Sequence, residues 1–299
     1  MISANIIKVL TDSKIEYKTD YSLSQSSTFR IGGVCALALF PKTAEQLALC
    51  LYVLDAEGIR THVCGRGSNT LFSDGHLDMA IVFTSGIDEV EINGTEVACG
   101  AGVGLIKLAS ICCDAGLSGL EFASGIPGSV GGAVFMNAGA YGSSMEKVVR
   151  NTVAYERSTG KTLTLTDHGF GYRKSVYMNN NDLVCLGATF SLKEGSTEEI
   201  RAEMRRLGEE RRKKQPLEYP SAGSYFKRPE GDFAGRLIEI CGLKGERVGG
   251  AAVSEKHAGF IVNLGGATFD DVMRLEERVR ETVFNQTGVM LHREVEVIV

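Results

Sequence analysis

Two glycine-rich stretches are the parts of this 299-residue sequence best suited to holding a phosphate. The longer one, Gly125–Gly139, reads Gly-Ile-Pro-Gly-Ser-Val-Gly-Gly-Ala-Val-Phe-Met-Asn-Ala-Gly. Its glycines permit backbone that a Cβ would forbid, and Pro127 fixes one φ angle. A helix predicted over Ser129–Phe135 would add backbone N–H groups that converge on an anion. Taken alone, the stretch fits a phosphate cradle and a tight turn between packed elements equally well.

The second stretch, Gly65–Thr70, directly follows a strand-like run, Thr61–Cys64. Two such turns in one chain suggest a ligand with two phosphates. Neither stretch is a standard mononucleotide motif. In the second stretch, for example, Thr70 stands where a Rossmann fingerprint needs its last glycine. The run Gly160-Lys161-Thr162 ends like a P-loop, but Tyr155 replaces the leading glycine, so a hairpin turn is predicted there.

Three further segments carry side chains suited to acid–base and electrostatic work. Arg173, in Tyr-Arg-Lys-Ser, could grip a carboxylate through two hydrogen bonds, although a surface arginine is the plainer reading. Ser224 follows Gly223, which allows the backbone to bend; the alternative is a turn serine. No Gly-x-Ser-x-Gly elbow surrounds Ser224, so hydrolase chemistry is unsupported. Glu294 opens the last alternating run. From the sequence alone, the plainer interpretation of this carboxylate is an outward-facing strand residue.

Hydrophobic periodicity and turn signals predict the elements that position these residues. Capping-box spacings at Thr43/Gln46 and Ser196/Glu199 mark two helix starts. Strands and helices mix without a sustained βα repeat, which predicts an α+β fold. A boundary near Gly195 gives domains 1–195 and 196–299. The expected helices are 2–15, 44–58, 105–115, 196–213, 232–241 and 269–287. The expected strands are 34–40, 59–64, 80–84, 183–192, 260–263 and 294–299, with hairpins at 89–99 and 148–165.

Composition narrows the function classes. The chain is 43% hydrophobic with a net charge of −5, so it can bury sizeable cores and lacks the basic excess of a general nucleic-acid binder. Eight cysteines include no Cys-x-x-Cys pair, which indicates a reducing cytoplasm and no zinc or other metal site. We expect no signal peptide and no membrane span, since no run approaches about 18 apolar residues.

The glycine stretches GRGSNTL (65–71) and GIPGSVGGAVFMNAG (125–139), with Ala140-Tyr141-Gly142, resemble the UDP-N-acetylenolpyruvoylglucosamine reductase (MurB) family. That family belongs to the FAD-binding proteins related to vanillyl-alcohol oxidase. The resemblance implies a two-lobed FAD-binding domain plus a smaller C-terminal α+β substrate domain. It implies noncovalent FAD, since His62 has no partner motif for attachment. The implied cofactor-binding residues are Gly65, Arg66, Gly67, Ser68, Asn69, Thr70, Leu71, Gly125, Ile126, Pro127, Gly128, Ser129, Gly131, Gly132, Ala133, Asn137 and Ala138.

The resemblance also assigns the reactive side chains. The family's Tyr-Arg-x-Ser motif falls on Arg173, its Gly-Ser-x-Phe-Lys motif makes Ser224 the proton donor, and Glu294 completes the catalytic set. Some members have Asn in place of Arg228, and many have Glu-Pro where this chain has His292-Arg293. No room exists between Phe190 and Ser221 for the extra substrate-capping segment, so the chain resembles the shorter type. The implied substrate contacts are Tyr141, Lys227, Arg228, Lys256, His257 and Asn263, although a lone His257 is more often structural.

The activity implied is NADPH-dependent reduction of UDP-N-acetylglucosamine enolpyruvate to UDP-N-acetylmuramate, in cytoplasmic peptidoglycan precursor synthesis. Hydride would pass from NADPH to FAD and then to the enolpyruvyl group, with no metal, nucleic acid, membrane or required protein partner. Two alternatives remain at this point. One is another FAD oxidase of the same superfamily that acts on an alcohol or sugar. The other is a non-catalytic flavin- or nucleotide-binding regulator, which would keep both glycine loops but not need Arg173, Ser224 and Glu294.

Overall fold

The computed structural model describes residues 2–299, and the chain forms two compact units. The first comprises the residues up to Asp20, Ala36–Arg66 and Asp78–Glu210. The second comprises Tyr21–Cys35, Gly67–Leu77 and Arg211–Val299. The domains expected from sequence, 1–195 and 196–299, divide the chain differently. Two early segments belong with the C-terminal residues because they pair with them, a long-range feature that linear composition does not reveal.

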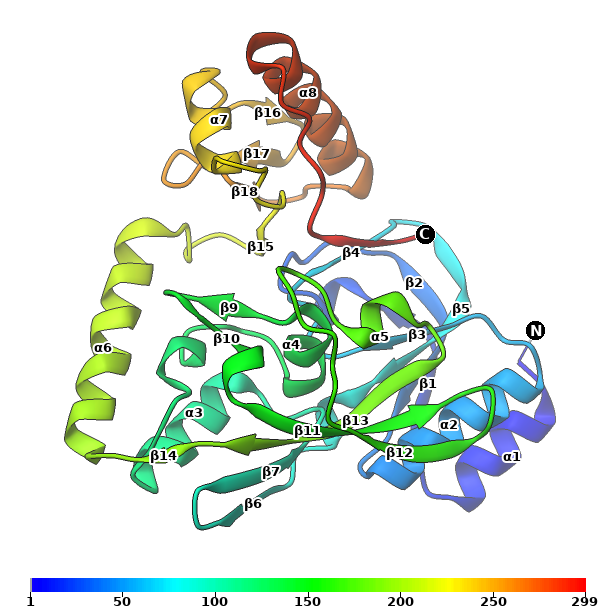
Figure 1. Cartoon of the computed structure of the whole chain (residues 1–299). Coiled ribbons are helices and arrows are strands. Elements are labelled where there is room, and N and C mark those ends of the chain that lie inside the picture. The colour runs from blue at the N-terminus through cyan, green and yellow to red at the C-terminus, as the bar shows by residue number, and fades with distance from the viewer. Residues whose placement is uncertain (1) are drawn as a thin grey trace. The chain divides into compact units, whose positions relative to one another are not determined.

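A four-stranded sheet in the order β1-β2-β5-β3 lies mainly in the first unit (Figure 1). Its last pair is parallel, with Thr61 opposite Ala80. Ile6 and Leu10 from one helix pack with Leu47 and Leu51 from the next in a core that includes β5. The elements are α1 (Ala4–Asp12), β1 (Glu16–Ser22), β2 (Val34–Phe40), α2 (Ala44–Ala56), β3 (Thr61–Cys64) and β5 (His76–Phe83).

The helix start predicted at Thr43 is confirmed with one difference. The Thr43 hydroxyl accepts the Gln46 N–H at 3.2 Å, as a capping residue does. The Gln46 side chain accepts its return bond from Lys42 N rather than from Thr43 N. The helix therefore begins as the sequence pattern predicts, and Gly58, with φ +64°, closes it.

A second, antiparallel sheet of the first unit has the order β12-β11-β13-β7-β6. Both hairpins predicted from sequence are present. Asn93 pairs with Glu96 around Gly94, and Glu156 pairs with Lys161 around Gly160. Gly160 has φ +69° and ends the predicted hairpin turn, and Lys161 and Thr162 begin the strand that follows it. The strands are β6 (Val90–Asn93), β7 (Glu96–Gly100), β11 (Val149–Glu156), β12 (Lys161–Leu165) and β13 (Leu183–Ser191).

Helices and short strands complete the first unit. Helix α4 contacts β13 and β7, and its buried Val130 and Val134 join a core with Leu105, Leu108 and Phe190. These elements are α3 (Leu105–Asp114), β8 (Leu117–Ser118), α4 (Val130–Met136), β9 (Gly139–Ala140), β10 (Ser143–Ser144), α5 (Val176–Asn179) and β14 (Lys193–Glu194). Helix α6 (Thr197–Lys214) continues the chain beyond them.

The second unit contains an antiparallel sheet in the order β15-β18-β17-β16. Helix α8 packs on β16 and β17 through the predicted stripe of Val272, Leu275, Val279 and Val283, all fully buried. Its elements are β15 (Ser221–Ser224), α7 (Ala234–Ile240), β16 (Arg247–Val248), β17 (Ala251–Val253), β18 (Phe260–Asn263) and α8 (Phe269–Thr287).

The C-terminal strand β19 (Glu296–Ile298) pairs in parallel with β4 (Thr70–Phe72), which follows the first glycine turn. The prediction placed the start of this strand at Glu294. The structure begins it two residues later, because the Glu294 N–H is donated to the Tyr225 carbonyl at 2.8 Å instead. Within residues 2–299, no helix combines the length and hydropathy needed to cross a membrane.

Helix α8 begins with a capping box that also binds a neighbouring turn. Thr268 Oγ1 accepts the Asp271 N–H at 3.1 Å, and Asp271 Oδ2 accepts the Thr268 N–H at 3.2 Å. The same Oδ2 accepts the Gly250 N–H at 3.1 Å. These backbone hydrogen bonds lower the pKa of the Asp271 carboxyl. A Cβ on Gly249 would lie 2.2 Å from Asp271 Oδ1, so the turn has to be glycine where it meets the carboxylate.

The Asp271→Asn variant should be less stable at neutral pH by about 1–2 kcal/mol, because it removes a charged acceptor at a helix N-terminus. A lowered folded-state pKa means that this stabilisation exists above the unfolded pKa of about 3.9 and is lost as pH falls through the folded pKa. Urea denaturation of the FAD-loaded wild type and variant across pH measures this. The gap between their midpoints should narrow below about pH 4.

Asp270→Asn is the matched control, since Asp270 is the exposed neighbour in the same helical turn and makes only a surface ion pair with Arg274. We expect it to cost less than about 1 kcal/mol. An equal effect of the two substitutions would show that the general charge of the turn, and not the capping box, is what stabilises α8.

Candidate functional site

The two glycine stretches meet inside the first unit. A Cβ built on Gly65 would lie 2.2 Å from the Ser129 hydroxyl oxygen, a distance that no side chain tolerates. Arg66 lies along Gly104 in the same way, because a Cβ there would approach its guanidinium to 2.9 Å. Glycine at 65 and 104 therefore allows the turn after β3 to pack against the loop before α4. The two stretches thus present small residues and backbone at one place, and the residues present fit the predicted group.

The start of α4 does not supply the anion donors that the sequence suggested. Ser129 caps the helix by accepting the Gly132 N–H. The Val130 N–H is donated to the Val103 carbonyl at 2.9 Å, and the Gly131 N–H to the Ala101 carbonyl at 2.8 Å. The first-turn donors of this seven-residue helix are thus engaged within the protein. Its residues contribute shape, and the expected role of their N–H groups at a phosphate is not supported.

The C-terminal end of α4 holds the turn that carries Arg173. Asn137 ends the helix in the left-handed region, with φ +41°. Its Nδ2 donates to the Gly171 carbonyl at 2.8 Å, and its Oδ1 accepts the Glu146 N–H. The Ser175 hydroxyl donates to the Phe135 carbonyl at 2.7 Å and caps α5. Buried Asn137 and Ser175 thus fix both ends of the Tyr-Arg-Lys-Ser segment to α4.

Arg173 occupies a strained position in a two-residue turn. Gly171 and Lys174 exchange reciprocal backbone hydrogen bonds of 3.1 and 3.2 Å across it. Arg173 has φ +49°, which costs a non-glycine residue about 1–3 kcal/mol. Its guanidinium lies 5.3 Å from the centroid of the Tyr172 ring, close enough for a cation–π contact. A half-buried arginine kept in this conformation, and anchored on both sides, is consistent with a functional constraint.

Ser224 and Glu294, 70 residues apart in the chain, come together in the second unit. Ser224 ends β15 and pairs with Phe260 of β18. The chain then pairs with the segment before β19. Glu294 N donates to the Tyr225 carbonyl, Lys227 N donates to the His292 carbonyl, and Phe226 bridges to Arg293. Ser224 is exposed and Glu294 half-buried. Two of the three predicted catalytic residues are therefore neighbours on one pair of chain segments.

Asn69 connects the first glycine turn to the same place. Its Nδ2 donates to the Glu294 carbonyl at 3.2 Å, and its carbonyl accepts the Glu296 N–H at 2.9 Å. The Gly67 carbonyl accepts the Thr28 N–H, and a Cβ on Gly67 would lie 2.3 Å from the Ser26 carbonyl. Asn69, a predicted cofactor-binding residue, thus hydrogen-bonds the backbone at Glu294, a predicted catalytic residue, and at Glu296. Sequence spacing gave no sign of this, because 225 residues separate the two.

The predicted substrate contacts have mixed surroundings. Tyr141 is exposed, has φ +54°, and donates its hydroxyl to the Leu207 carbonyl at 3.3 Å. Lys256 lies 3.6 Å from Glu218, and the Arg228 guanidinium lies 4.3 Å from the Phe233 ring centroid. Lys227 is half-buried. Each of these four carries a polar group at or near the surface, where a ligand could reach it.

His257 and Asn263 serve structural roles that need no ligand. His257 Nδ1 accepts the Gly259 N–H at 3.1 Å, and its ring packs edge-on against Phe260. Burial lowers its pKa, which favours the neutral ring. The buried Asn263 amide donates to the Phe29 carbonyl and accepts the Gly265 and Ala267 N–H groups. His257 thus has the structural surroundings that were its alternative, and the substrate contacts expected of these two residues stay a prediction.

Sequence reasoning missed a buried charged cluster beside Ser224 and Glu294. The Tyr225 hydroxyl donates to Glu276 Oε2 at 2.8 Å, and Arg293 Nη1 lies 3.1 Å from the same oxygen. Glu276 is 4% exposed. A signal was present in the sequence, since Glu276 follows Val272 by four residues and precedes Val279 by three. This spacing places a carboxylate on the apolar face of α8.

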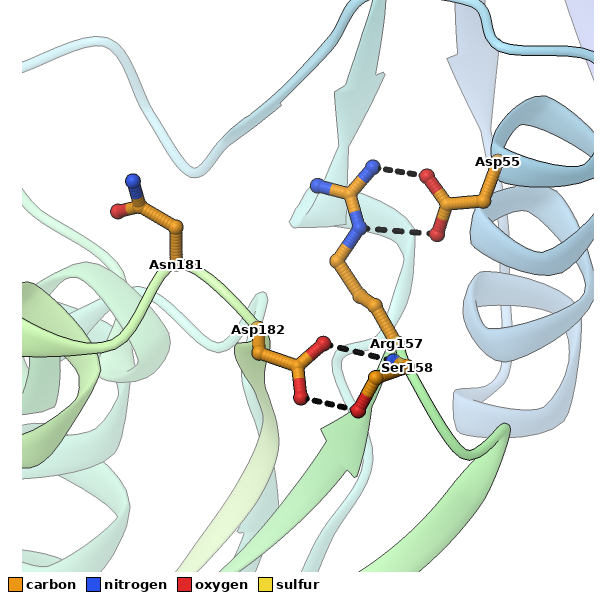
Figure 2. Close-up of a pocket in the computed structure, with 5 residues that line it drawn as sticks. All are labelled: Asp55, Arg157, Ser158, Asn181 and Asp182. Atoms are coloured by element: carbon orange, nitrogen blue, oxygen red, sulfur yellow. Dashed lines mark hydrogen bonds and ion pairs between the residues drawn. The ribbon is translucent and has the colours of Figure 1, made fainter.

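A polar pocket of about 410 Å³ lies elsewhere in the first unit (Figure 2). Arg157 Nε donates to Asp55 Oδ2 at 2.9 Å, and the carboxylate raises the pKa of the guanidinium. Asp182 accepts the Ser158 N–H and hydroxyl, both at 2.6 Å (Figure 2). The polar groups of this pocket mainly satisfy one another, and none of the predicted site residues lines it.

Seven of the eight cysteine side chains are buried. None of the eight cysteines forms a disulfide, and burial raises the pKa of the Cys50, Cys112 and Cys185 thiols to about 12. A thiol with such a pKa stays protonated near neutral pH, whereas the thiolate is the metal ligand. Across residues 2–299, no three His, Cys, Asp or Glu side chains are grouped as a metal site would need.

Comparison with known proteins places these features in a family. Residues 35–165 match the profile of an FAD binding domain, and residues 215–298 match that of the C-terminal domain of UDP-N-acetylenolpyruvoylglucosamine reductase. The reductase of Anoxybacillus flavithermus is 42% identical over 283 residues, 94% of each chain. That of Caldicellulosiruptor bescii is 44% identical and covers 97% of this chain and 93% of its own.

Solved structures agree. The crystal structure of the reductase (MurB) from Thermus caldophilus superposes with a TM-score of 0.81 at 34% identity, covering 95% of this chain and 99% of that chain. Alkyldihydroxyacetonephosphate synthase has a TM-score of 0.52 at 11% identity over 65% of this chain, a likeness of fold alone. The α+β fold expected from sequence is confirmed. This chain belongs to the UDP-N-acetylenolpyruvoylglucosamine reductase family.

Proposed function

We propose that Arg173, Ser224 and Glu294 are the catalytic residues for NADPH-dependent reduction of UDP-N-acetylglucosamine enolpyruvate to UDP-N-acetylmuramate, a step of peptidoglycan precursor synthesis. The main supporting observation is that Ser224 and Glu294 meet, 70 residues apart, through the Glu294 N–H and the Tyr225 carbonyl. The family assignment rests on several relatives above 40% identity, all named as this reductase. It leaves the oxidase and regulator alternatives without support of their own.

FAD, when bound, supplies hydride transfer from NADPH to the enolpyruvyl carbon. The residues proposed to hold it are those of the two glycine stretches, from Gly65 to Leu71 and from Gly125 to Ala138. Gly65 and Ser129 give close contact between the stretches, and Asn69 links the first stretch to Glu294 by a hydrogen bond to its carbonyl. Arg66, which lies along Gly104, provides a positive charge suited to phosphate oxygens.

The protein's own groups would manage the charge and the proton. As hydride adds to the terminal alkene carbon, the alkene electron pair moves toward the substrate carboxylate. Arg173 would stabilise this negative charge, and one such donor is worth about 3–4 kcal/mol. Glu294, if held protonated, would donate a hydrogen bond to the same carboxylate. The Ser224 hydroxyl would then deliver a proton to the carbon that bears the ether oxygen, which completes the lactyl group.

Tyr141, Lys227, Arg228 and Lys256 are proposed contacts for the UDP-sugar. Three are cations, which suit a diphosphate. A cytoplasmic location is also proposed. It is supported by the lack of disulfides among the eight cysteines, because disulfides form in oxidising compartments.

Ser224→Ala should leave flavin reduction by NADPH intact and slow flavin reoxidation by the enolpyruvyl sugar roughly 10²- to 10⁴-fold, because only the second step needs the proton. Anaerobic stopped-flow absorbance measures the two steps separately on FAD-loaded protein. Ser221→Ala, at the other end of β15, is the control and should match wild type in both. Fast reoxidation of the Ser224→Ala flavin would remove Ser224 from the mechanism.

Gly65→Ala should lower the FAD content of purified protein, because the added Cβ would meet Ser129 Oγ at 2.2 Å and force the stretches apart. Gly65→Ala/Ser129→Ala should recover much of the FAD, since the next atom, Ser129 Cβ, lies 3.4 Å away. Gly75→Ala is the control, because its Cβ would meet nothing within 4 Å. Flavin absorbance per protein gives the result. Full FAD content in Gly65→Ala would contradict the proposed cradle.

A further inference from the structure

We propose that Glu276, with Arg293 and Tyr225, positions Ser224 and Glu294 for the transfer to substrate. The inference rests on the proposed catalytic roles of those two residues. Glu276 lies in the middle of α8, and its side chain reaches the two segments that carry them. The cluster consists of one carboxylate, one phenol and one guanidinium, and none of the three is itself in the proposed catalytic set.

The contacts of Glu276 join the two segments at one atom. Its Oε2 accepts the Tyr225 hydroxyl at 2.8 Å and lies 3.1 Å from Arg293 Nη1. Tyr225 directly follows Ser224, and Arg293 directly precedes Glu294. The catalytic residues are therefore each one peptide bond from a side chain held by the same carboxylate oxygen. The backbone closes the arrangement, because the Glu294 N–H is donated to the Tyr225 carbonyl.

Because Glu276 is buried, its contacts restrict the movement of the Tyr225 and Arg293 segments relative to each other. Tyr225 is 1% exposed and Glu276 4%, whereas Arg293 keeps 31% of its side chain in contact with solvent. A buried carboxylate without its partners would be poorly solvated, so the two segments cannot separate without exposing or neutralising Glu276. The other Glu276 oxygen lies 3.8 Å from Arg280 Nη1 on the same helix. Arg280 Nε donates to the Leu291 carbonyl at 3.1 Å, so it adds a second link to the segment before Glu294 but contacts no residue next to Ser224.

The position of the cluster favours a role in geometry over a role in general stability. Most of the second unit's core is aliphatic and aromatic, and α8 is already anchored by Val272, Leu275, Val279 and Val283. The charged cluster stands only where α8 meets the Tyr225 and Arg293 segments. A proton donor is sensitive to small displacement, since a shift of about 1 Å can cost roughly 10²-fold in rate.

The test separates the two flavin half-reactions in FAD-loaded protein. In Glu276→Gln, the amide oxygen can still accept hydrogen bonds from Tyr225 and Arg293, but the negative charge that holds the Arg293 guanidinium is lost. Reoxidation of the flavin by UDP-N-acetylglucosamine enolpyruvate should slow roughly 10- to 100-fold, while reduction by NADPH stays within about twofold. Arg293→Gln should show the same split, and Arg293→Lys should recover part of the reoxidation rate. The double variant should be no slower than the worse single variant, as expected for one shared interaction.

Glu246→Gln is the matched control. Glu246 pairs with Arg278 of the same helix but reaches neither the Ser224 nor the Glu294 segment. It should leave both half-reactions unchanged. If Glu276→Gln does not retain FAD, Arg293→Gln, at a partly exposed position, carries the test.

Equal slowing of the two half-reactions, unchanged reoxidation in both single variants, or loss of FAD from Arg293→Gln would overturn the proposal, since each indicates a structural role or none. Ser224→Ala and Glu294→Gln are measured alongside. Normal reoxidation in those two would instead show that the proposed catalytic set is wrong. Slow reoxidation in those two with normal rates in Glu276→Gln and Arg293→Gln would reject the positioning role alone.

Discussion

The parallel pairing of β4 with β19 is the contact on which the second unit depends. It joins Thr70–Phe72, directly after a glycine turn, to Glu296–Ile298 at the end of the chain. Parallel strands so far apart in sequence carry a large loop-closure cost, which must be met by the contacts that follow. Asn69 supplies two of these contacts through its hydrogen bonds to the Glu294 carbonyl and the Glu296 N–H. The pairing therefore brings a residue of the first glycine turn and the proposed catalytic glutamate together, and it explains why the second unit includes an early segment.

The sequence predicted local structure well and long-range association poorly. Hairpins around Gly94 and Gly160 and the apolar stripe of α8 were predictable, because period and turn chemistry are encoded within a few residues. The membership of Tyr21–Cys35 and Gly67–Leu77 in the second unit was not, since it depends on pairings that span the chain. The predicted site residues came from motifs, and the structure supplied what motifs lack: Ser129 packs against Gly65, and the N–H groups of α4 are engaged elsewhere.

Three of the six non-glycine residues with positive φ within residues 2–299 lie in one region of the first unit. Asn137, Tyr141 and Arg173 are non-glycine residues with positive φ, and all three lie in or near the α4 end that holds the Arg173 turn. Each such residue costs about 1–3 kcal/mol and persists only where surrounding contacts determine it. Here the determining contacts can be named: the Asn137 amide on Gly171 and the Ser175 hydroxyl on Phe135. Ser175 of the Tyr-Arg-Lys-Ser motif thus accompanies Arg173 because its hydroxyl anchors the C-terminal end of the turn to α4.

The buried cluster at Glu276 follows the same logic in the second unit. A buried ion pair is a weak source of stability, because apolar residues of similar volume often pack as well or better. Its directional contacts are the property that a Leu or Met at 276 could not reproduce, since neither side chain offers an oxygen that accepts from both a phenol and a guanidinium. Aliphatic packing holds α8 on its sheet, but such contacts are non-directional and leave the adjacent segments some freedom of position. A shared acceptor between Tyr225 and Arg293 removes that freedom where two proposed catalytic residues must keep their spacing.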